Sequence, residues 1–165
     1  MVDIWPVILV DTREQVPLVF DRRFRIERAT LAVGDYGVRG FSGWENPAFI
    51  VERKSLEDLC QSLGAGRERF LREVERMRQF RFRALIIEGM REEVTAGEYR
   101  SEITPAAVLA TLDALAVRSG LHVFWCGDAA GAARQVESLA RQFVRGVVRD
   151  AERLGLRILG AGEVG

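Results

Sequence analysis

The sequence predicts an α/β domain with a central mixed β-sheet flanked by helices, and three observations predict it. Residues 4–11 and 83–88 are short apolar runs with the length and composition of buried strands. Residues 31–39 and 48–54 are strand-like segments joined by a short connection rich in glycine, serine and proline, as in a hairpin. The later segments alternate between helical and strand patterns, which is typical of parallel strands joined by helices.

The elements follow in order along the chain. A second strand is predicted at residues 25–30, between the first strand and the hairpin. Ser55 is placed as the N-cap of a helix that runs through residue 63. The Gly-Ala-Gly of residues 64–66 interrupts this pattern, and a second helix is predicted at residues 67–79.

The last third of the chain predicts helix, strand and helix. Thr104 followed by Pro105 is a helix start, and this helix ends near Gly120. A short strand is predicted at residues 122–126, and Asp128 can cap a long last helix. The apolar residues of that helix recur at spacings of three and four and form one stripe: Val136, Leu139, Ala140, Phe143, Val147, Ala151 and Leu154.

The composition is that of a folded and charge-balanced domain. The chain has 165 residues, of which 48% are hydrophobic, and its formal net charge is zero with a pI near 6.6. We expect a single domain over residues 1–165, because no repeat, low-complexity linker or change of composition divides the chain. Since the net charge gives no nucleic-acid signal, any basic binding surface must be a local patch.

Nothing in the sequence predicts secretion or a membrane span. The first residues lack the basic start and cleavage site of a secretory signal, and no apolar run approaches about 18 residues. Cys60 and Cys126 form neither a metal-type pair nor a disulfide framework. We therefore expect a cytoplasmic protein with reduced thiols, nucleoid-associated if it is bacterial, and no membrane partner.

The first indication of the chemistry is the only lysine, Lys54. The sequence has 24 lysine and arginine residues, and all the others are arginine. A lysine ammonium is compact, sits on a flexible stem and has a readily shifted pKa, whereas the planar guanidinium stays charged. Residues 51–58 read Val-Glu-Arg-Lys-Ser-Leu-Glu-Asp and flank the lysine with carboxylates. Hydrolytic chemistry would place a cation in such surroundings.

The predicted hairpin brings further acids to this lysine. Asp35 lies opposite the region of Glu52, and alternation along the strand puts Glu52 and Lys54 on one face. Asp11, at the end of the first strand, could join them at the same end of the sheet. Two or three carboxylates at that separation form a hard oxygen site of the kind that Mg²⁺ or Mn²⁺ prefers. By spacing alone, however, this pattern of acids and lysine often arises by chance.

Two segments make the pattern specific. Residues 31–36 read Leu-Ala-Val-Gly-Asp-Tyr, and residues 51–59 read Val-Glu-Arg-Lys-Ser-Leu-Glu-Asp-Leu. Together they closely resemble the signature of the XPF-type structure-specific endonucleases: Gly-Asp, a variable gap, Glu-Arg-Lys, three residues and Asp. The resemblance spans roughly residues 5–150. It extends, in the right order, to residues 10–14, 62–67, 85–88 and 120–123.

The resemblance implies a restriction-endonuclease-like fold and Mg²⁺- or Mn²⁺-dependent cleavage of branched DNA such as flaps, forks and bubbles. It marks Asp35 and Glu52 as metal ligands, Asp11 as a further acid near the metal, and Lys54 as the water-activating cation. Family members usually carry a helix-hairpin-helix domain and some a helicase region, neither of which we expect within this chain.

The resemblance also implies supporting roles for three residues of the motif. Arg13 and Arg53 would maintain the active site or contact phosphate, and Asp58 would lie in a second layer around the metal. Asp58 has an equally good structural interpretation, because Ser55 and Asp58 together form something like a capping box. Glu14 and Glu88 are either site residues or ordinary acids at strand ends.

Residues 66–83 hold seven arginines against three glutamates. Such a helix is either a solvated face with Glu–Arg pairs or a stripe that follows phosphates beside the cleavage site. The concentration of charge in a neutral chain favours the second interpretation. We predict DNA contacts from Arg67, which follows a glycine-flanked turn at a helix N-terminus, and from three further arginines: Arg69, Arg72 and Arg76.

The sequence leaves alternatives for the assembly, the activity and the substrate. The last two helices either cover the sheet or, as the resemblance suggests, form a homodimer or heterodimer interface, which would be isologous in a symmetric pair. The rival to a nuclease is a non-catalytic subunit that binds branched DNA. Such subunits usually lack one of the acids or the lysine, and none is missing here. A third hypothesis is a nuclease that acts on RNA.

Overall fold

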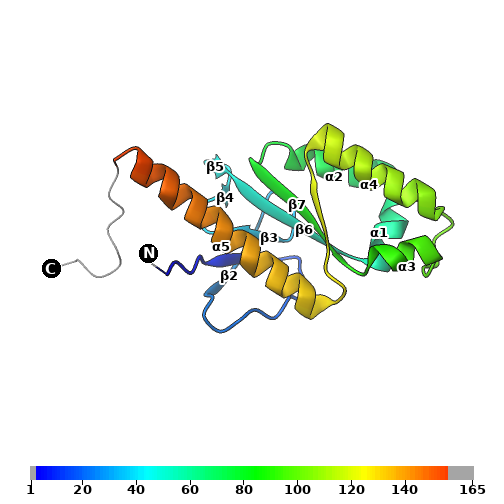
Figure 1. Ribbon diagram of the computed structural model, residues 1–165, viewed down its shortest axis with the longest axis horizontal. Coiled ribbons are helices and arrows are strands. Elements are labelled where there is room, and N and C mark those ends of the chain that lie inside the picture. The colour runs from blue at the N-terminus through cyan, green and yellow to red at the C-terminus, as the bar shows by residue number, and fades with distance from the viewer. Residues whose placement is uncertain (1–2, 156–165) are drawn as a thin grey trace.

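The computed structural model describes residues 3–155 and forms one six-stranded mixed sheet. The spatial order of the strands is β2-β1-β3-β6-β7-β8 (Figure 1). β3 runs antiparallel to both of its neighbours, whereas β1 pairs with β2, β6 with β7 and β7 with β8 in parallel. The strands are β1 (Ile8–Asp11), β2 (Ile26–Ala29), β3 (Tyr36–Val38), β6 (Phe49–Ser55), β7 (Phe82–Glu88) and β8 (His122–Trp125).

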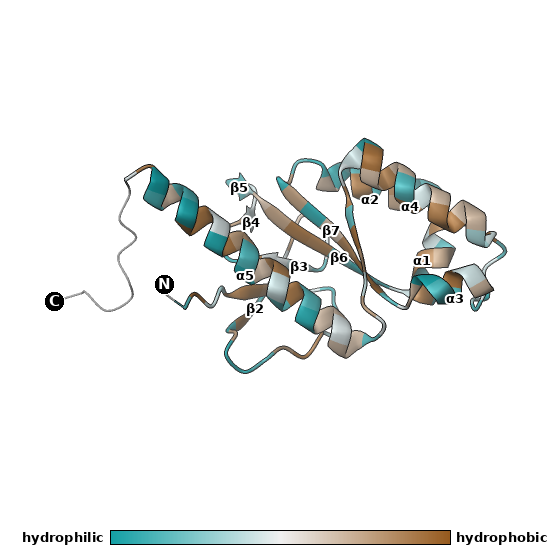
Figure 2. Ribbon diagram, in the orientation of Figure 1, coloured by the Kyte–Doolittle hydropathy of each residue, from teal (hydrophilic) through white to brown (hydrophobic). Residues whose placement is uncertain are grey.

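The helices divide between the two faces of the sheet, as Figure 1 shows. Four helices contribute to a core with Ile50, Leu85 and Ile87 on one face, and the fifth packs against Val10, Val51 and Ile86 on the other. The apolar runs of residues 49–51 in β6 and 84–87 in β7 are fully buried (Figure 2), as expected of central strands covered on both faces. The helices are α1 (Leu56–Leu63), α2 (Arg67–Met77), α3 (Arg91–Ala96), α4 (Pro105–Ser119) and α5 (Ala129–Arg153).

The predicted helix starts are confirmed in detail. The backbone N–H of Asp58 donates to Ser55 Oγ at 3.1 Å, and the N–H of Gly131 donates to Asp128 Oδ1 at 2.7 Å. Thr104 caps α4 in the same way. Each cap satisfies one of the backbone donors that a helix leaves unpaired in its first turn.

Three details differ from the prediction. The first strand pairs only from Ile8, and residues 32–35 form bends before the short β3. The connection at residues 40–47 contains a small hairpin of β4 (Ser42–Gly43) and β5 (Asn46–Pro47). The short helix α3 has no counterpart in the prediction, since six residues are too few to show a helical period.

The last helix is longer than the sheet that it covers. Val136 and Ala140 are fully buried, whereas Leu154, near the end of the predicted stripe, is 78% exposed.

Both cysteines are free, with Cys60 buried and Cys126 half-buried. Within residues 3–155, no helix combines the length and apolar character needed to cross a bilayer.

Candidate active site

The motif residues meet where β3 begins and β6 ends. Tyr36, the first residue of β3, pairs with Val51, so Asp35 lies immediately before the strand and opposite Glu52. The Asp35 N–H donates to the Val51 carbonyl at 2.8 Å, and the Arg53 N–H donates to the Asp35 carboxylate at 2.8 Å. The predicted hairpin register, with Asp35 opposite Glu52, is therefore confirmed.

Gly34 is what allows Asp35 to reach this position. Its φ is 77°, in the left-handed region that residues with a side chain rarely adopt. A Cβ at this position would lie 2.7 Å from Ile50 Cγ1 and 3.0 Å from the Val51 carbonyl oxygen. The glycine of the Gly-Asp motif thus lets the chain turn tightly against β6 and aim the aspartate at the end of that strand.

Glu52 and Lys54 share one face of β6, as the alternation of side chains predicted. Lys54 Nζ lies 3.0 Å from Glu52 Oε1, and both side chains are largely buried. The ammonium also lies 5.5 Å from the centre of the Phe70 ring, within reach of a cation–π interaction. Burial alone would lower the pKa of Lys54, but the neighbouring carboxylates outweigh it and raise that pKa. Lys54 is consequently a fixed positive charge at neutral pH.

The two acids repel one another in a poorly solvated place. Burial is the largest influence and raises the pKa of Asp35 to about 6. Burial and then the charge of Asp35 raise the pKa of Glu52 to about 7. A buried pair of like charges is held partly protonated unless a cation joins it.

A cavity of about 240 Å³ opens above these residues. The sheet side of the cavity is lined by Asp35, Glu52 and Lys54 together with Val33 and Gly34. Helix α2 contributes the remaining wall through Arg69, Glu73 and Arg76. The wall residue Glu73 was not predicted as part of the site. It lies four residues after Arg69 and three before Arg76, and residues at these spacings share one face of a helix. This spacing was the signal in the sequence that Glu73 would face the same cavity as the two arginines. The charged residues that line the cavity are Arg13, Asp35, Glu52, Lys54, Arg69, Glu73 and Arg76.

Asp11 lies at the same sheet end but is bound to Arg13. Arg13 Nε donates to Asp11 Oδ1 at 2.6 Å and Arg13 Nη2 to Oδ2 at 3.1 Å, and the Leu31 N–H donates to the same carboxylate. Burial would raise the pKa of Asp11, but these hydrogen bonds together outweigh it and lower that pKa. Asp11 therefore orients Arg13 at the rim of the cavity, and its carboxylate does not line the cavity itself.

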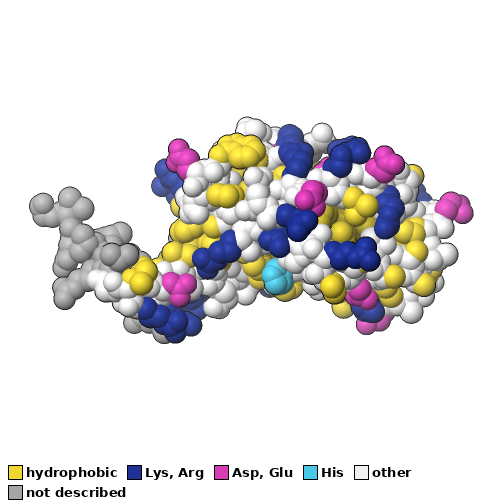
Figure 3. Space-filling view, turned by 90° about the horizontal axis from the view of Figure 1, so that it is seen from above, with side chains coloured by type: hydrophobic (Ala, Val, Ile, Leu, Met, Phe, Trp, Pro, Cys, Tyr) yellow, Lys and Arg dark blue, Asp and Glu magenta, His cyan; other side chains and the backbone are white. Residues whose placement is uncertain are grey.

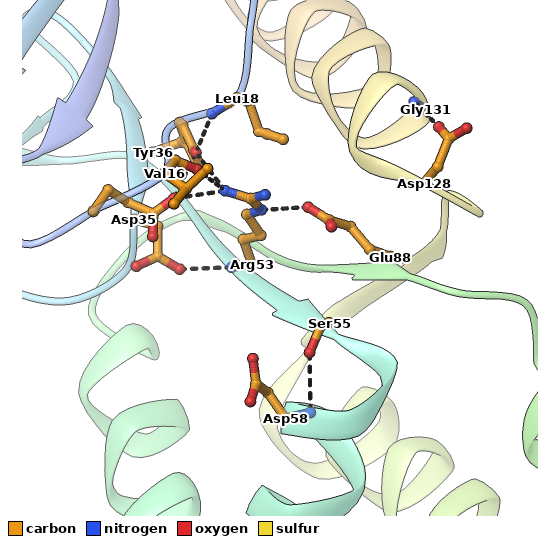
Figure 4. Close-up of polar contacts among 11 residues, drawn as sticks. Val16, Leu18, Asp35, Tyr36, Arg53, Ser55, Asp58, Glu88, Asp128 and Gly131 are labelled. Carbon is orange, nitrogen blue, oxygen red and sulfur yellow. Dashed lines mark hydrogen bonds and ion pairs between the residues drawn. The ribbon is translucent and has the colours of Figure 1, made fainter. Parts of the chain in front are cut away.

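The Arg53 side chain lies on the face of β6 opposite to Glu52 and Lys54, where it contacts Val16 and Glu88 (Figure 4). Its guanidinium donates to Glu88 and, at 2.9 Å, to Glu14 Oε2, and it also donates to the Val16 carbonyl at 2.7 Å. The Tyr36 hydroxyl donates to the same Glu14 carboxylate at 2.7 Å. Arg53 thus links β6 to β7 and to residues 14–16, and it lines two hollows that lie beside the cavity. Its role, in maintaining the site or in contacting phosphate, stays a prediction.

Asp58 lies at the N-terminus of α1, outside the cavity that Asp35 and Glu52 line. Its backbone takes part in the Ser55 cap (Figure 4), and its carboxylate is exposed beside two larger hollows. This bond confirms the Ser55 cap but uses the backbone of Asp58 and not its carboxylate. The capping box and a role of Asp58 in catalysis both stay predictions.

The four arginines predicted to contact DNA separate into two pairs. Arg69 and Arg76 line the cavity, and Arg76 donates to the Ala32 carbonyl. Arg67 instead donates to Thr111 of α4 at 3.0 Å, and Arg72 lies on the exposed side of α2. Arg67 lies nine residues before Arg76, which at about 100° per residue is about 180° around the helix, so the two cannot face one groove.

Three hollows adjoin at this end of the sheet. The cavity shares Lys54, Arg69 and Glu73 with a hollow of about 950 Å³ that extends to residues 100–103, and shares Arg13 with a third hollow of about 360 Å³. We call the three together the site groove. Figure 3 shows arginines as the main charged side chains over a broad part of one face of the molecule.

The residues present fit a hard divalent cation. Asp35 and Glu52 offer carboxylate oxygens to one cavity. Their pKa values are raised, chiefly by burial and further by neighbouring carboxylates, and a divalent cation between them would favour their ionised forms. Within residues 3–155, no group of three or more His, Cys, Asp or Glu side chains is arranged to hold a metal, so the expected third ligand, Asp11, does not join the pair. Mg²⁺ often needs only one or two carboxylates and keeps several waters.

The raised pKa values predict a pH-dependent metal affinity. A cation must displace the protons that Asp35 and Glu52 retain up to about pH 6 and pH 7. Lowering the pH from 8 to 6 should therefore weaken Mn²⁺ binding on the order of tenfold, as measured by calorimetry. In Asp35→Asn the dependence should be shallower, and an affinity in the wild type that ignores pH would contradict this picture of the pair.

Comparisons with known proteins agree with the motif and the fold. The ERCC4 domain family matches residues 10–139. The DNA repair endonuclease UVH1 of Arabidopsis thaliana is 30% identical over an alignment of 128 residues, and the match covers 72% of this chain but only 12% of that protein. XPF from Aeropyrum pernix has a TM-score of 0.65 at 24% identity, covering 90% of this chain and 70% of that one.

A second structure of the Aeropyrum pernix XPF, in complex with DNA, has a TM-score of 0.65 at 25% identity and covers 86% of this chain and 66% of that one. These likenesses confirm the predicted restriction-endonuclease-like fold. Since the family match spans most of the residues that build the sheet and contains Asp35, Glu52 and Lys54, the chain belongs to the ERCC4 domain family of XPF-type nucleases.

Proposed function

We propose that this protein is a Mg²⁺- or Mn²⁺-dependent endonuclease that hydrolyses DNA phosphodiesters at or near branches such as flaps, forks and bubbles. One observation carries the proposal: Asp35, Glu52 and Lys54 converge in one cavity beside a groove lined by arginines. The relatives support the substrate, since one is named a DNA repair endonuclease and another is a structure in complex with DNA.

Each residue of the cavity has a defined part in this chemistry. Asp35 and Glu52 would hold the cation, which when bound neutralises phosphoryl charge and lowers the pKa of a water molecule. Lys54 is charged and within hydrogen-bond distance of Glu52, so its ammonium can orient the attacking water or stabilise the charge that develops on the phosphate. Its raised pKa argues against a role as the proton acceptor.

The arginines at the rim would position the substrate. Arg13, fixed by two hydrogen bonds to Asp11, presents its guanidinium beside Asp35 and Glu52. Arg69 and Arg76 face the same cavity from α2 and would contact phosphates on either side of the scissile bond. Arg67 and Arg72 would contribute only through more distant phosphates.

The lysine provides a sharp test of the mechanism. Lys54→Arg keeps the charge but replaces a compact ammonium with a longer planar group in a space bounded by Glu52 and Phe70. We expect cleavage to fall by about 10²-fold or more, with the unfolding temperature little changed. Rates on a flap substrate and a thermal melt would measure both, and full activity in this variant would remove the reason for the unique lysine.

The rival function is a non-catalytic subunit that binds branched DNA, and RNA is the alternative substrate. The retention of both acids and the lysine favours a catalyst. Wild type and Glu52→Gln should be assayed on matched flap, fork, nicked and linear DNA and on the equivalent RNA, with Mg²⁺ and with Mn²⁺. Metal-dependent cleavage of branched DNA by the wild type alone supports the proposal, and cleavage by neither protein refutes it.

The assembly proposed is a homodimer or heterodimer through the C-terminal helices. The resemblance to the family supports this proposal, and the exposed Leu154 at the end of α5 (78% exposed) is one apolar side chain that such an interface could cover. A mass measurement in solution would give the oligomer. We also propose a cytoplasmic location.

A further inference from the structure

A second pocket lies on the face of the sheet that α5 covers, away from the cavity that holds Asp35 and Glu52. It has a volume of about 220 Å³ and is bounded by α5 and by the segments that precede β1 and β2 (Figure 1). Four arginines line it against a single carboxylate, that of Glu137, and Glu137 already accepts the backbone N–H of Asp21. The arginines are Arg23, Arg134, Arg141 and Arg145.

The surface of the pocket is mostly polar and charged. The guanidiniums of Arg23 and Arg141 lie 4.4 Å and 3.9 Å from the centre of the Trp5 ring and so cover the indole. Trp5 in turn packs edge-on against Phe24 at 5.0 Å. A base or an aromatic side chain therefore finds no free ring to stack on, and a ligand is recognised through its negative charge.

The chain itself places an anion against the pocket. Arg141 Nη2 donates to Asp3 Oδ1 at 2.7 Å, and the Trp5 indole N–H donates to Asp3 Oδ2 at 3.0 Å. Asp3 is 64% exposed and belongs to the segment before β1, so this carboxylate can leave without disturbing the sheet. Arg23 is similarly paired with Asp21, whereas Arg134 and Arg145 have no ion pair within residues 3–155.

The spacing of the arginines favours a repeating anion. Arg134, Arg141 and Arg145 follow one side of α5 at about 10 Å and then about 6 Å along the helix axis. A nucleic-acid strand presents phosphates in such a line, and arginine forks bind them through paired hydrogen bonds. An acidic peptide would also need apolar anchors for its side chains, and the covered Trp5 removes the obvious one.

We infer that this pocket binds backbone phosphates of a second arm of the branched substrate, and that Asp3 occupies Arg141 until that arm arrives. The inference rests on the proposed function. Since the pocket and the cavity that holds Asp35 and Glu52 lie toward opposite faces of the sheet, one straight duplex arm does not suit both, whereas a branched substrate sends its arms in different directions. We call Arg134, Arg141 and Arg145 with Trp5 the arm pocket.

The test compares two variants that remove equal charge from α5. Arg141→Gln/Arg145→Gln alters the arm pocket, and Arg149→Gln/Arg153→Gln alters exposed residues further along the same helix. Binding of a labelled flap and of a linear duplex is measured by fluorescence anisotropy in EDTA, which prevents cleavage, over a range of salt. Thermal melts check that each variant is folded.

The arm-pocket variant should bind the flap at least about tenfold more weakly, with the slope of log K against log salt reduced by about two. The control variant should change far less, the linear duplex should lose little, and Asp3→Asn should bind the flap several-fold more tightly. Equal flap affinity for the two double variants would overturn the inference. The inference would also be overturned if a glutamate hexapeptide displaced the flap while inorganic pyrophosphate did not. That result would identify a site for acidic peptides.

Failure of this inference and failure of the proposed function are separable. A wild-type protein that binds flaps through the arm pocket but shows no metal-dependent cleavage would refute the nuclease and leave the pocket intact. Cleavage of flaps with unchanged affinity in Arg141→Gln/Arg145→Gln would do the reverse.

Discussion

Replacing Glu52 with glutamine is expected to abolish cleavage and, in the same protein, to raise the stability of the metal-free fold. The neutral amide cannot supply the charged oxygen that a divalent cation requires, so the rate should fall by at least about 10³-fold. The amide nearly reproduces the shape of the carboxyl, so DNA binding should persist.

The stability gain follows from the sign of the pKa shift. The pKa of Glu52 is raised to about 7 by burial and by Asp35, so the folded state binds this proton more tightly than the unfolded chain does. The stabilisation from the protonated carboxyl is complete below the unfolded pKa and is lost as the pH rises to about 7. At pH 8 the ionised side chain therefore destabilises the fold, by about 1–3 kcal/mol, and Glu52→Gln removes that cost.

Urea unfolding of both proteins at pH 5 and pH 8, in EDTA, measures this directly. The variant should be more stable than the wild type at pH 8, and the difference should shrink at pH 5. Added Mg²⁺ should stabilise only the wild type, because only it retains the carboxylate pair. A variant that is less stable at pH 8 would mean that the ion pair with Lys54 outweighs the repulsion from Asp35.

Replacing Arg53 with alanine is expected to be the most destabilising single substitution in the motif, by about 3–5 kcal/mol. The change leaves Glu14 and Glu88 half-buried without their cation, and it also removes the donor to the Val16 carbonyl. Arg53 lines two hollows of the site groove but not the cavity of Asp35 and Glu52, so cleavage per folded molecule should fall far less than in Glu52→Gln.

The neighbouring acids supply the control for this prediction. With Glu14→Gln and Glu88→Gln already in place, Arg53→Ala should cost much less, because no carboxylate is left unpaired. Arg53→Lys should be intermediate, since one ammonium cannot reach both acids and the carbonyl together. An Arg53→Ala protein with an unchanged urea midpoint would show that this network contributes nothing to the fold.

The elements and the core of the site were predictable because they depend on local signals. The Gly/Ser/Pro-rich connection and the alternation along β6 were enough to place Asp35 opposite Glu52, and Glu52 and Lys54 on one face. The caps at Ser55, Thr104 and Asp128 were predictable from side chains that compete locally for backbone donors.

What escaped prediction depends on which partner a flexible side chain selects. Asp11 was expected to join Asp35 and Glu52, but Arg13, two residues away, folds back and binds both of its oxygens. Glu73 enters the cavity from α2, whose placement against β6 is a tertiary effect. Arg67 has a suitable position at a helix N-terminus, yet its guanidinium is held by Thr111.

The most direct test of the central claim is to locate a cation. Crystals of the protein with Mn²⁺, and anomalous scattering from the manganese, give its position without reference to activity. The account predicts a peak within about 2.3 Å of carboxylate oxygens of both Asp35 and Glu52, absent in Glu52→Gln. A manganese ion bound elsewhere, or none near these two carboxylates at saturating concentration, would contradict it.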